Sequence, residues 1–326
     1  LSDELEAAVE REILSDAQPM AVSPDKIGKA YRIDDARGRY IEYAKQSLGP
    51  TDLSGLKLVV DCGHGAAYLL APLIFKELGA KVTKLGVDPD GLNINAGVGA
   101  LHPEHAAQAV REQGADLGIS FDGDADRVIF TDETGATVSG DRVLTLCALA
   151  MQTEGTLRGS TMACTVMSNL GLHESMRQAG VQVLTTPVGD RHVIEALRSG
   201  GYSFGGENSG HLIFADHATT GDGILSALQV LRIMKQKGAR LSDLAKAMHE
   251  YPQSLENLRI KSKPPLASLQ HLQAAVQEAD ATFGIQGRHL IRYSGTENKI
   301  RILVEHREAA TSPLGPNASA PPWNSI

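Results

Sequence analysis

The chain has 326 residues, which is too long for one ordinary domain and predicts two or three. Its hydrophobic content of 42% and charged content of 21% are typical of a soluble globular protein. The formal net charge of -8 and the aromatic content of 4% argue against nucleic-acid partners, and no apolar stretch is long enough to cross a membrane.

The three cysteines, Cys62, Cys147 and Cys164, are odd in number and lack the spacing of a metal site. Reduced thiols are the simplest explanation and, with no signal peptide at the start, we expect a cytoplasmic protein. The chain begins at Leu1 within an acidic helical pattern, which suggests that it is cut from something longer. Residues 311–326 are rich in Pro, Ala and Ser and are predicted to be disordered.

The first part of the chain is predicted to contain a helical segment followed by one β-turn-α-β unit. The expected helices are at residues 2–13, 34–48, 67–78 and 103–113. The expected strands are at residues 56–61, 81–85 and 116–121. Gly63 and Gly65 follow the first strand, and without a third glycine they indicate a tight turn better than a nucleotide site.

A similar unit recurs downstream, with strands at 160–166 and 181–185 around a helix at 172–179. Residues 77–82 and 178–183 occupy the same place in each unit, which supports two related α/β domains. Further helices are expected at 142–151, 192–198 and 223–235, and a short strand at 202–204.

After Tyr251 and Pro252 the pattern changes to that of a smaller α+β domain. Its expected elements are a strand at 255–260, a helix at 266–279 and strands at 290–292 and 300–304. The predicted division of the chain is an N-terminal helix and connector at 1–35, α/β domains at 36–140 and 141–252, the α+β domain at 253–308 and a tail at 309–326.

The loop after strand 116–121 carries carboxylates at alternate positions, Asp122, Asp124 and Asp126. Carboxylates this close repel one another unless a cation lies among them, and oxygen ligands favour Mg²⁺ or Ca²⁺. Arg127 adds a fixed positive charge that suits an anion such as phosphate. Ligand sites in parallel α/β sheets lie at the C-terminal ends of strands, where this loop is expected.

The residues of this loop alone leave other interpretations open. A calcium loop would use Glu133 at its twelfth position, but Arg127 replaces the turn glycine at the sixth and the flanks look like strands. A phosphatase of the haloacid-dehalogenase type would use Asp122 as nucleophile and Asp124 as acid/base. A solvated acidic turn would bind nothing.

A second polar loop, at residues 205–211, places four polar side chains among three glycines: Glu207, Asn208, Ser209 and His211. Such groups match the donors and acceptors of a sugar ring. Upstream, Gly189 and Asp190 precede a helix, and this helix start suits an anion or a sugar hydroxyl as well as a plain cap.

A third loop follows strand 290–292 and contains Ser294, Gly295 and Thr296 between Arg292 and Arg301. Two hydroxyls, free backbone N–H groups and two guanidinium groups have the composition of a phosphate cradle. The alternative is an ordinary hairpin turn with surface arginines.

Together, the loops at 122–127, 205–211 and 292–297 resemble those of the α-D-phosphohexomutase family, and most closely its phosphoglucosamine mutase branch. The resemblance extends from the start of the chain to about Val304. It implies four domains around one cleft, of which this chain holds the second and third, both α/β, and the smaller α+β fourth. The family's first domain carries a phosphorylated serine in a Ser-His-Asn motif that this sequence lacks, so we expect the chain to be inactive alone.

The resemblance also implies an activity: Mg²⁺-dependent interconversion of glucosamine 6-phosphate and glucosamine 1-phosphate through a phosphoserine and a bisphosphate, for cell-wall amino-sugar nucleotide synthesis. Phosphomannomutase or phosphoglucomutase activity, or a non-catalytic phosphosugar-binding protein, are the alternatives. Asn208 stands where the phosphoglucosamine branch usually has Gln.

The family pattern assigns a role to each matching residue. It implies that Asp122, Asp124 and Asp126 hold Mg²⁺ and that Arg127 stabilises the transferring phosphoryl group. It implies that the sugar is bound by Glu207, Ser209 and His211. The phosphate that does not react is expected to be held by Arg292, Ser294, Gly295, Thr296 and Arg301.

Overall fold

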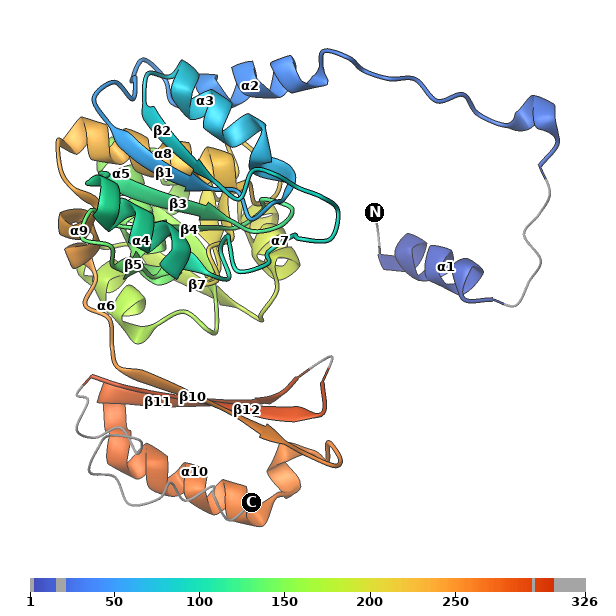
Figure 1. The fold of residues 1–326 in the computed structure, drawn as a ribbon. Helices are drawn as coiled ribbons and strands as arrows, with labels where there is room; N and C mark the ends of the chain where they lie inside the picture. Colours follow the sequence, from blue (N-terminus) through green and yellow to red (C-terminus); the bar gives the residue numbers. More distant parts are fainter. Residues whose placement is uncertain (1–2, 16–21, 295–296, 308–326) are drawn as a thin grey trace. The chain divides into compact units, whose positions relative to one another are not determined.

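The computed structural model describes residues 3–15, 22–294 and 297–307, and the chain divides into two compact units, Leu1–Arg39 and Tyr40–Ile326 (Figure 1). The first unit contains α1 (Asp3–Ile13), a 3₁₀ turn at Pro24–Lys26 and the start of α2 (Ala36–Gln46). The second unit contains every candidate site residue that is described. The predicted disordered tail, 311–326, lies outside the described residues.

The first sheet of the second unit has the strand order β2-β1-β3-β4-β5. Its strands are β1 (Lys57–Asp61), β2 (Lys81–Leu85), β3 (Leu117–Phe121), β4 (Val128–Thr131) and β5 (Thr137–Val138). β1 runs parallel to β2 and β3, whereas β3 and β4 form an antiparallel hairpin. The acidic loop is the turn of this hairpin.

Both faces of this sheet are covered, since alternate residues of a strand point to opposite sides. Leu58 and Val60 join the large core that includes α3 (Leu70–Glu77), while Val59 packs with the alanines of α4 (Pro103–Gln113). The helix expected at 67–78 begins as a 3₁₀ turn, Ala66–Tyr68, before α3.

The second sheet repeats this arrangement in the order β7-β6-β8-β9. Its strands are β6 (Thr161–Thr165), β7 (Gln182–Thr186), β8 (Phe204–Gly206) and β9 (Leu212–Phe214). β6 is parallel to β7 and β8, and β8 and β9 form an antiparallel hairpin. The expected relation between the two α/β domains is therefore present in their topology, and the polar loop at 207–211 corresponds to the acidic loop.

Two long helices, α5 (Gly140–Glu154) and α8 (Gly223–Lys237), contribute to one core shared by both sheets. The second sheet also has α6 (Leu170–Gln178) and α7 (Asp190–Gly200), the latter packing through Val193 and Leu197 on Ala163 of β6. Because this shared core joins the two domains, their loops are fixed with respect to each other.

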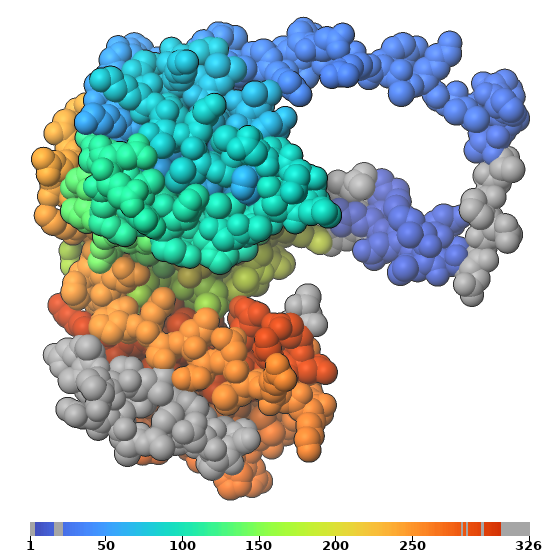
Figure 2. Space-filling model, in the orientation of Figure 1, coloured from blue at the N-terminus to red at the C-terminus, as the bar shows by residue number. Residues whose placement is uncertain are grey.

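The C-terminal domain is an antiparallel sheet in the order β10-β12-β11 with one long helix. Its elements are β10 (Gln253–Arg259), α10 (Gln270–Phe283), β11 (Gly287–Tyr293) and β12 (Lys299–His306). Ile302 and Val304 pack with Phe283 of α10, so the alternate residues of β12 face the other way. The predicted α/β, α/β and α+β architecture is confirmed. Figure 2 shows the first α/β domain in blue to green and the C-terminal domain in orange and red.

Several short elements differ from the predictions. The strand expected at 202–204 is observed two residues further along, as β8 at Phe204–Gly206. Gly205 and Gly206 are therefore strand residues and not loop residues. β5, β9 and the short helix α9 (Leu241–Leu244) were not predicted. All three cysteines are buried and free. Among the helices in the described ranges, none is long and apolar enough to span a bilayer.

Candidate active site

The acidic loop brings its three carboxylates together at the end of the β3–β4 hairpin. One ligand atom from each of Asp122, Asp124 and Asp126 lies within 4.8 Å of the other two. Asp122 is buried, Asp126 is partly exposed and Asp124 is exposed. The predicted set of carboxylates therefore converges on one point that solvent can reach.

Arg127 neutralises part of this charge. Its Nε lies 3.1 Å from Asp122 Oδ2 and 3.3 Å from Asp126 Oδ1, and its backbone N–H donates to Asp122 Oδ1 at 3.1 Å. Burial, followed by the carboxylate of Asp126, raises the pKa of Asp122 to about 6 despite these contacts. One guanidinium group does not neutralise three carboxylates, so the loop keeps a net negative charge that a bound cation would offset.

The flanks of the acidic loop test the calcium-loop interpretation, which requires a helix on each side. Both are strands, and the carboxylate of Glu133 accepts a hydrogen bond from Ser242 Oγ on another element. The calcium-loop interpretation is therefore wrong. Three carboxylates that offer oxygen ligands fit Mg²⁺ well.

Close backbone packing fixes the acidic loop from two sides. Ala66 N donates to Gly123 O at 2.8 Å, and a Cβ on Gly65 would lie 2.3 Å from that oxygen. From the other domain, Gly223 N at the start of α8 donates to Ala125 O at 2.9 Å. Ala125 itself has a positive φ of 63°. The two glycines let neighbouring chain segments approach the loop closely enough to bond its carbonyls.

The second loop meets the first through its backbone and through His211. Val128 N donates to Gly210 O at 3.1 Å, which joins the two hairpins. His211 is only 2% exposed, and its Nδ1 lies 3.2 Å from Asp126 Oδ2. Its position makes it a partner of a predicted metal ligand, a relation that sequence reasoning did not anticipate.

Glu207 is oriented by the helix start that the sequence also singled out. Its Oε1 accepts a hydrogen bond from Gly189 N at 3.0 Å, and its own N–H donates to His211 O at 2.8 Å. The N–H at this helix start is thus used by a side chain of the same domain. Glu207 is therefore fixed through one carboxylate oxygen, and its side chain lines a cavity.

Arg292 and Arg301 lie directly opposite each other on β11 and β12. Burial, followed by the charge of Arg301, lowers the pKa of Arg292, and Arg301 Nε is buried without a hydrogen-bond partner among the described residues. Arg301 Nη2 lies 3.4 Å from Glu297 Oε2, so one carboxylate faces two guanidinium groups that repel each other. Their arrangement favours the phosphate cradle over a surface turn.

One cavity of about 370 Å³ collects side chains from all three loops. Its lining includes Asp126, Arg127, Glu207, Ser209, His211, Arg292 and Arg301. Met167, Val188, Asp190 and Asn208 also line it. The sequence points to Asp190 and Asn208 as polar candidates, but not to Met167 or Val188. The volume lies within the usual range for small-molecule sites.

The third loop is described in part. Ser294 is buried, its Oγ accepts from Glu297 N at 3.3 Å and its carbonyl accepts from Lys263 Nζ at 2.6 Å. Lys263 was not predicted, and no motif surrounds it. Gly295 and Thr296, both predicted phosphate ligands, lie outside the described residues.

Comparison with known proteins connects these loops to a family. The chain matches three domain models of the phosphoglucomutase/phosphomannomutase family: α/β/α domain II at residues 38–135, α/β/α domain III at 139–251 and the C-terminal domain at 255–312. A phosphoglucosamine mutase from Geotalea daltonii is 51% identical over 310 residues, which cover 94% of this chain and 68% of that protein.

Solved structures support the same fold. A phosphoglucomutase/phosphomannomutase family protein from Burkholderia thailandensis has a TM-score of 0.73 at 23% identity, covering 98% of this chain and 72% of that one. An N-acetylphosphoglucosamine mutase from Aspergillus fumigatus, in complex with GlcNAc-6P and magnesium, has a TM-score of 0.65 at 20% identity over 84% of this chain and 67% of that one. With the sequence identity and the three domain matches, the chain belongs to the phosphoglucomutase/phosphomannomutase family, the α-D-phosphohexomutases.

Proposed function

We propose that the chain carries the metal, sugar and phosphate sites of a phosphoglucosamine mutase, which interconverts glucosamine 6-phosphate and glucosamine 1-phosphate. The observation that carries the proposal is the single cavity that joins Asp126 and Arg127 to Glu207 and Ser209 and to the arginine pair. A sugar phosphate needs a carboxylate for its hydroxyls and cations for its phosphate, and the cavity offers both.

Relatives support the choice of sugar. The relative from Geotalea daltonii is named a phosphoglucosamine mutase, and a more distant structural neighbour is described in complex with GlcNAc-6P and magnesium. We place the reaction in the cytoplasm, where three buried thiols without disulfide partners stay reduced, and in the supply of amino-sugar nucleotides for the cell wall.

In this proposal the reacting end of the sugar lies at the acidic loop. Asp122, Asp124 and Asp126 would hold Mg²⁺, which when bound offsets the charge of the phosphoryl oxygens. Arg127 stabilises the phosphoryl group as it passes between a phosphoserine and the sugar oxygen. The phosphoserine is supplied from outside these 326 residues, because the sequence has no Ser-His-Asn motif.

The other end of the sugar phosphate is held by the C-terminal domain. Arg292 and Arg301, with Ser294, Gly295 and Thr296, bind the phosphate that does not react. Glu207 and Ser209 bind ring hydroxyls. His211 assists by holding the carboxylate of Asp126 in place. Because the cavity is lined by Arg127 from the acidic loop and by Arg292 and Arg301 from the C-terminal domain, both phosphates of the bisphosphate intermediate would find a cation after it reorients.

The experiment is a binding and turnover test on the 326-residue chain. Calorimetric titration with glucosamine 6-phosphate, glucose 6-phosphate and mannose 6-phosphate should give the tightest binding for the amino sugar. A coupled assay for glucosamine 1-phosphate should show no turnover by the chain alone. Turnover without an added phosphoserine domain would contradict the assignment of the nucleophile, and preference for mannose 6-phosphate would contradict the choice of sugar.

A further inference from the structure

One face of the C-terminal sheet carries two charged pairs. Arg288 lies opposite Glu305 and Arg292 lies opposite Arg301 in the register of β11 and β12. The neighbouring residues Ile302 and Val304 face α10, so both pairs share the face that points away from α10. The pairs lie four positions apart along each strand, which corresponds to roughly 13 Å.

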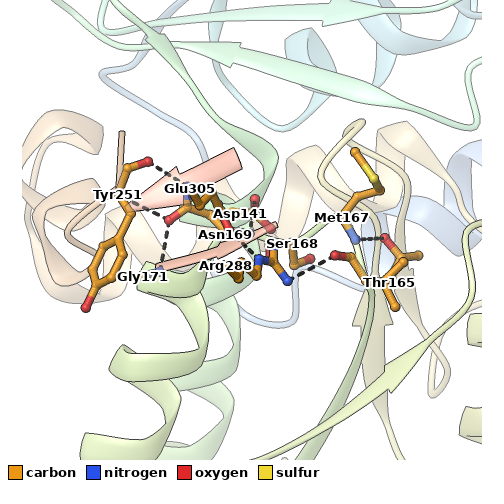
Figure 3. Close-up of polar contacts among 10 residues, drawn as sticks. Asp141, Thr165, Met167, Ser168, Asn169, Gly171, Tyr251, Arg288 and Glu305 are labelled. Carbon is orange, nitrogen blue, oxygen red and sulfur yellow. Dashed lines mark hydrogen bonds and ion pairs between the residues drawn. The ribbon is translucent and has the colours of Figure 1, made fainter. Parts of the chain in front are cut away.

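Arg288 joins this sheet face to the second α/β domain. Its Nε donates to the fully buried carboxylate of Glu305, and its Nη2 donates to the carbonyl of Ser168 (Figure 3). Its Nη1 donates to the carbonyl of Val166 at 3.1 Å. These carbonyls follow the C-terminal end of β6, and the residue between them is Met167, which lines the proposed substrate cavity.

The connection between the two domains is tied at a second point. Asn169 Nδ2 donates to Tyr251 O at 2.9 Å, and Tyr251 N donates to Asn169 Oδ1 at 2.9 Å. Tyr251 lies two residues before β10, and Asn169 N donates to Asp141 Oδ2 at 2.9 Å (Figure 3). Asn169 thus holds the linker. Arg288, together with the Glu305 carboxylate that faces the backbone N–H of Leu170, joins the sheet to the second α/β domain at a separate point.

We propose that Arg288 is a positioning residue: by binding residues 166–168 it sets the distance between the phosphate-binding pair, Arg292 and Arg301, and the sugar-binding loop. This role rests on the proposed function, since a sugar phosphate must span both parts at once. The planar guanidinium group suits the task because it bonds one carboxylate and two carbonyls in fixed directions, which a lysine ammonium group cannot do.

The affinities of two ligands of different size distinguish a positioning role of Arg288 from a general effect on the stability of the chain. Glucosamine 6-phosphate contacts both the sugar loop and the arginine pair, whereas inorganic phosphate needs only the arginine pair. In Arg288→Lys we expect glucosamine 6-phosphate to bind about tenfold more weakly, because the second contact loses its effective concentration. Inorganic phosphate should bind within about twofold of the unchanged chain, since its contacts stay on one sheet.

A double variant, Arg288→Met with Glu305→Leu, replaces the buried ion pair by apolar side chains and keeps the sheet intact. It should likewise bind glucosamine 6-phosphate more weakly while its affinity for inorganic phosphate stays nearly unchanged. Arg259→Lys, at the exposed end of β10, is the matched control and should change neither affinity. Arg292→Ala should weaken both ligands, which would show that the arginine pair is the phosphate site.

A distance measurement tests the same inference without any ligand. Spin labels at Ser199→Cys and Asn257→Cys, both exposed, report the separation of the two domains, while the native cysteines are buried. The distance distribution should broaden in Arg288→Lys and in the double variant. Equal weakening of both ligands, or an unchanged distance distribution, would overturn the positioning role.

Failure of the proposed function would look different. If the unchanged chain binds inorganic phosphate and no glucosamine 6-phosphate, the proposed sugar is wrong. The distance distribution then decides the role of Arg288 alone: broadening supports it, and an unchanged distribution refutes it.

Discussion

His211 Nδ1 lies 3.2 Å from Asp126 Oδ2, although the two residues belong to hairpins of different domains. The histidine is 2% exposed, and a Cβ on Gly221 would lie 2.3 Å from its Nε2, so the ring has little freedom to turn. A ring fixed in this way orients the Asp126 carboxylate from behind, as outer-shell groups do at metal sites.

His211→Phe should therefore weaken metal binding without unfolding the chain. The phenyl ring fills a similar space but cannot bond Asp126, and loss of such an outer-shell partner typically lowers metal affinity by about 10- to 100-fold. Calorimetric titration with Mg²⁺, or electron paramagnetic resonance with Mn²⁺, measures the change. His102→Phe is the control, because His102 pairs with Glu104 at the exposed start of α4. Unchanged affinity in His211→Phe would refute the orienting role.

Gly65→Ala should displace the acidic loop. The added methyl group would lie 2.3 Å from Gly123 O, and one side or the other must move. We expect a loss of about 1–3 kcal/mol in the free energy of unfolding together with weaker Mn²⁺ binding. Gly38→Ala is a useful comparison, because its Cβ would meet nothing within 4 Å and it lies inside α2. That variant should gain up to about 1 kcal/mol. Equal effects of both changes on metal binding would contradict the prediction.

Tyr40→Phe should destabilise the start of α8. The Tyr40 hydroxyl contacts Asp222 Oδ1 at 3.0 Å and Oδ2 at 2.9 Å, and Asp222 caps α8 by accepting from Leu225 N at 2.9 Å. Burial raises the pKa of Asp222, so its carboxylate depends on these donors. Removing the hydroxyl should lower the free energy of unfolding by about 1–3 kcal/mol in urea titrations.

The matched control for Tyr40 is Tyr43→Phe on the same helix. Tyr43 is 48% exposed and donates to the backbone carbonyl of His217, so water can replace its partner. Its loss should have a clearly smaller effect. An equal effect of the two variants would show that burial of Asp222 contributes nothing.

The buried carboxyl group of Asp141 should make the free energy of unfolding fall as the pH rises. Burial raises its pKa to about 6, and Glu250 adds to this while Asn169 N, Ser168 and Arg288 oppose it. Below about pH 4 the carboxyl is protonated in both the folded and the unfolded chain. Between about pH 4 and 6 the unfolded chain releases the proton first, so folding loses on the order of 3 kcal/mol, and the loss is complete above about pH 6.

Denaturant titrations of the unchanged chain and of Asp141→Asn between pH 4 and 7 test this. The difference between the two isolates Asp141 from other carboxyl groups, including the neighbouring Glu305, whose pKa is also raised by burial. The unchanged chain should lose stability relative to Asp141→Asn as the pH rises. Parallel curves would contradict the assignment.

Much of the fold could be predicted, because periodicity and glycine positions mark long elements clearly. The helix at 103–113 and the strand at 81–85 match α4 and β2 residue for residue. β8 was misplaced because glycines look like loop residues in sequence. Gly205 and Gly206 form a strand where a Cβ would meet Ala163 O at 2.6 Å or His211 O at 2.4 Å, a constraint that only tertiary packing reveals.

The candidate site was predictable where a motif names its chemistry, and less so where a contact crosses domains. The three carboxylates and the arginine pair converge as their spacing suggested. The burial of His211 against Asp126, and the use of Gly189 N by Glu207, depend on how the hairpins pack and have no local signal. The pairing of Arg288 with the carbonyls of Val166 and Ser168 is of the same kind.

The bond from Val128 N to Gly210 O links two hairpins that hold the same position in each repeat. Since main-chain atoms make this link, the side chains at Asn208 and Ser209 can be exchanged without disturbing it. Gly210 cannot, because its φ is +91° and a Cβ would lie 2.4 Å from Val128 O. A lineage, or a designer, can therefore change the side chains of the polar loop at 207–211 while the acidic loop keeps its place.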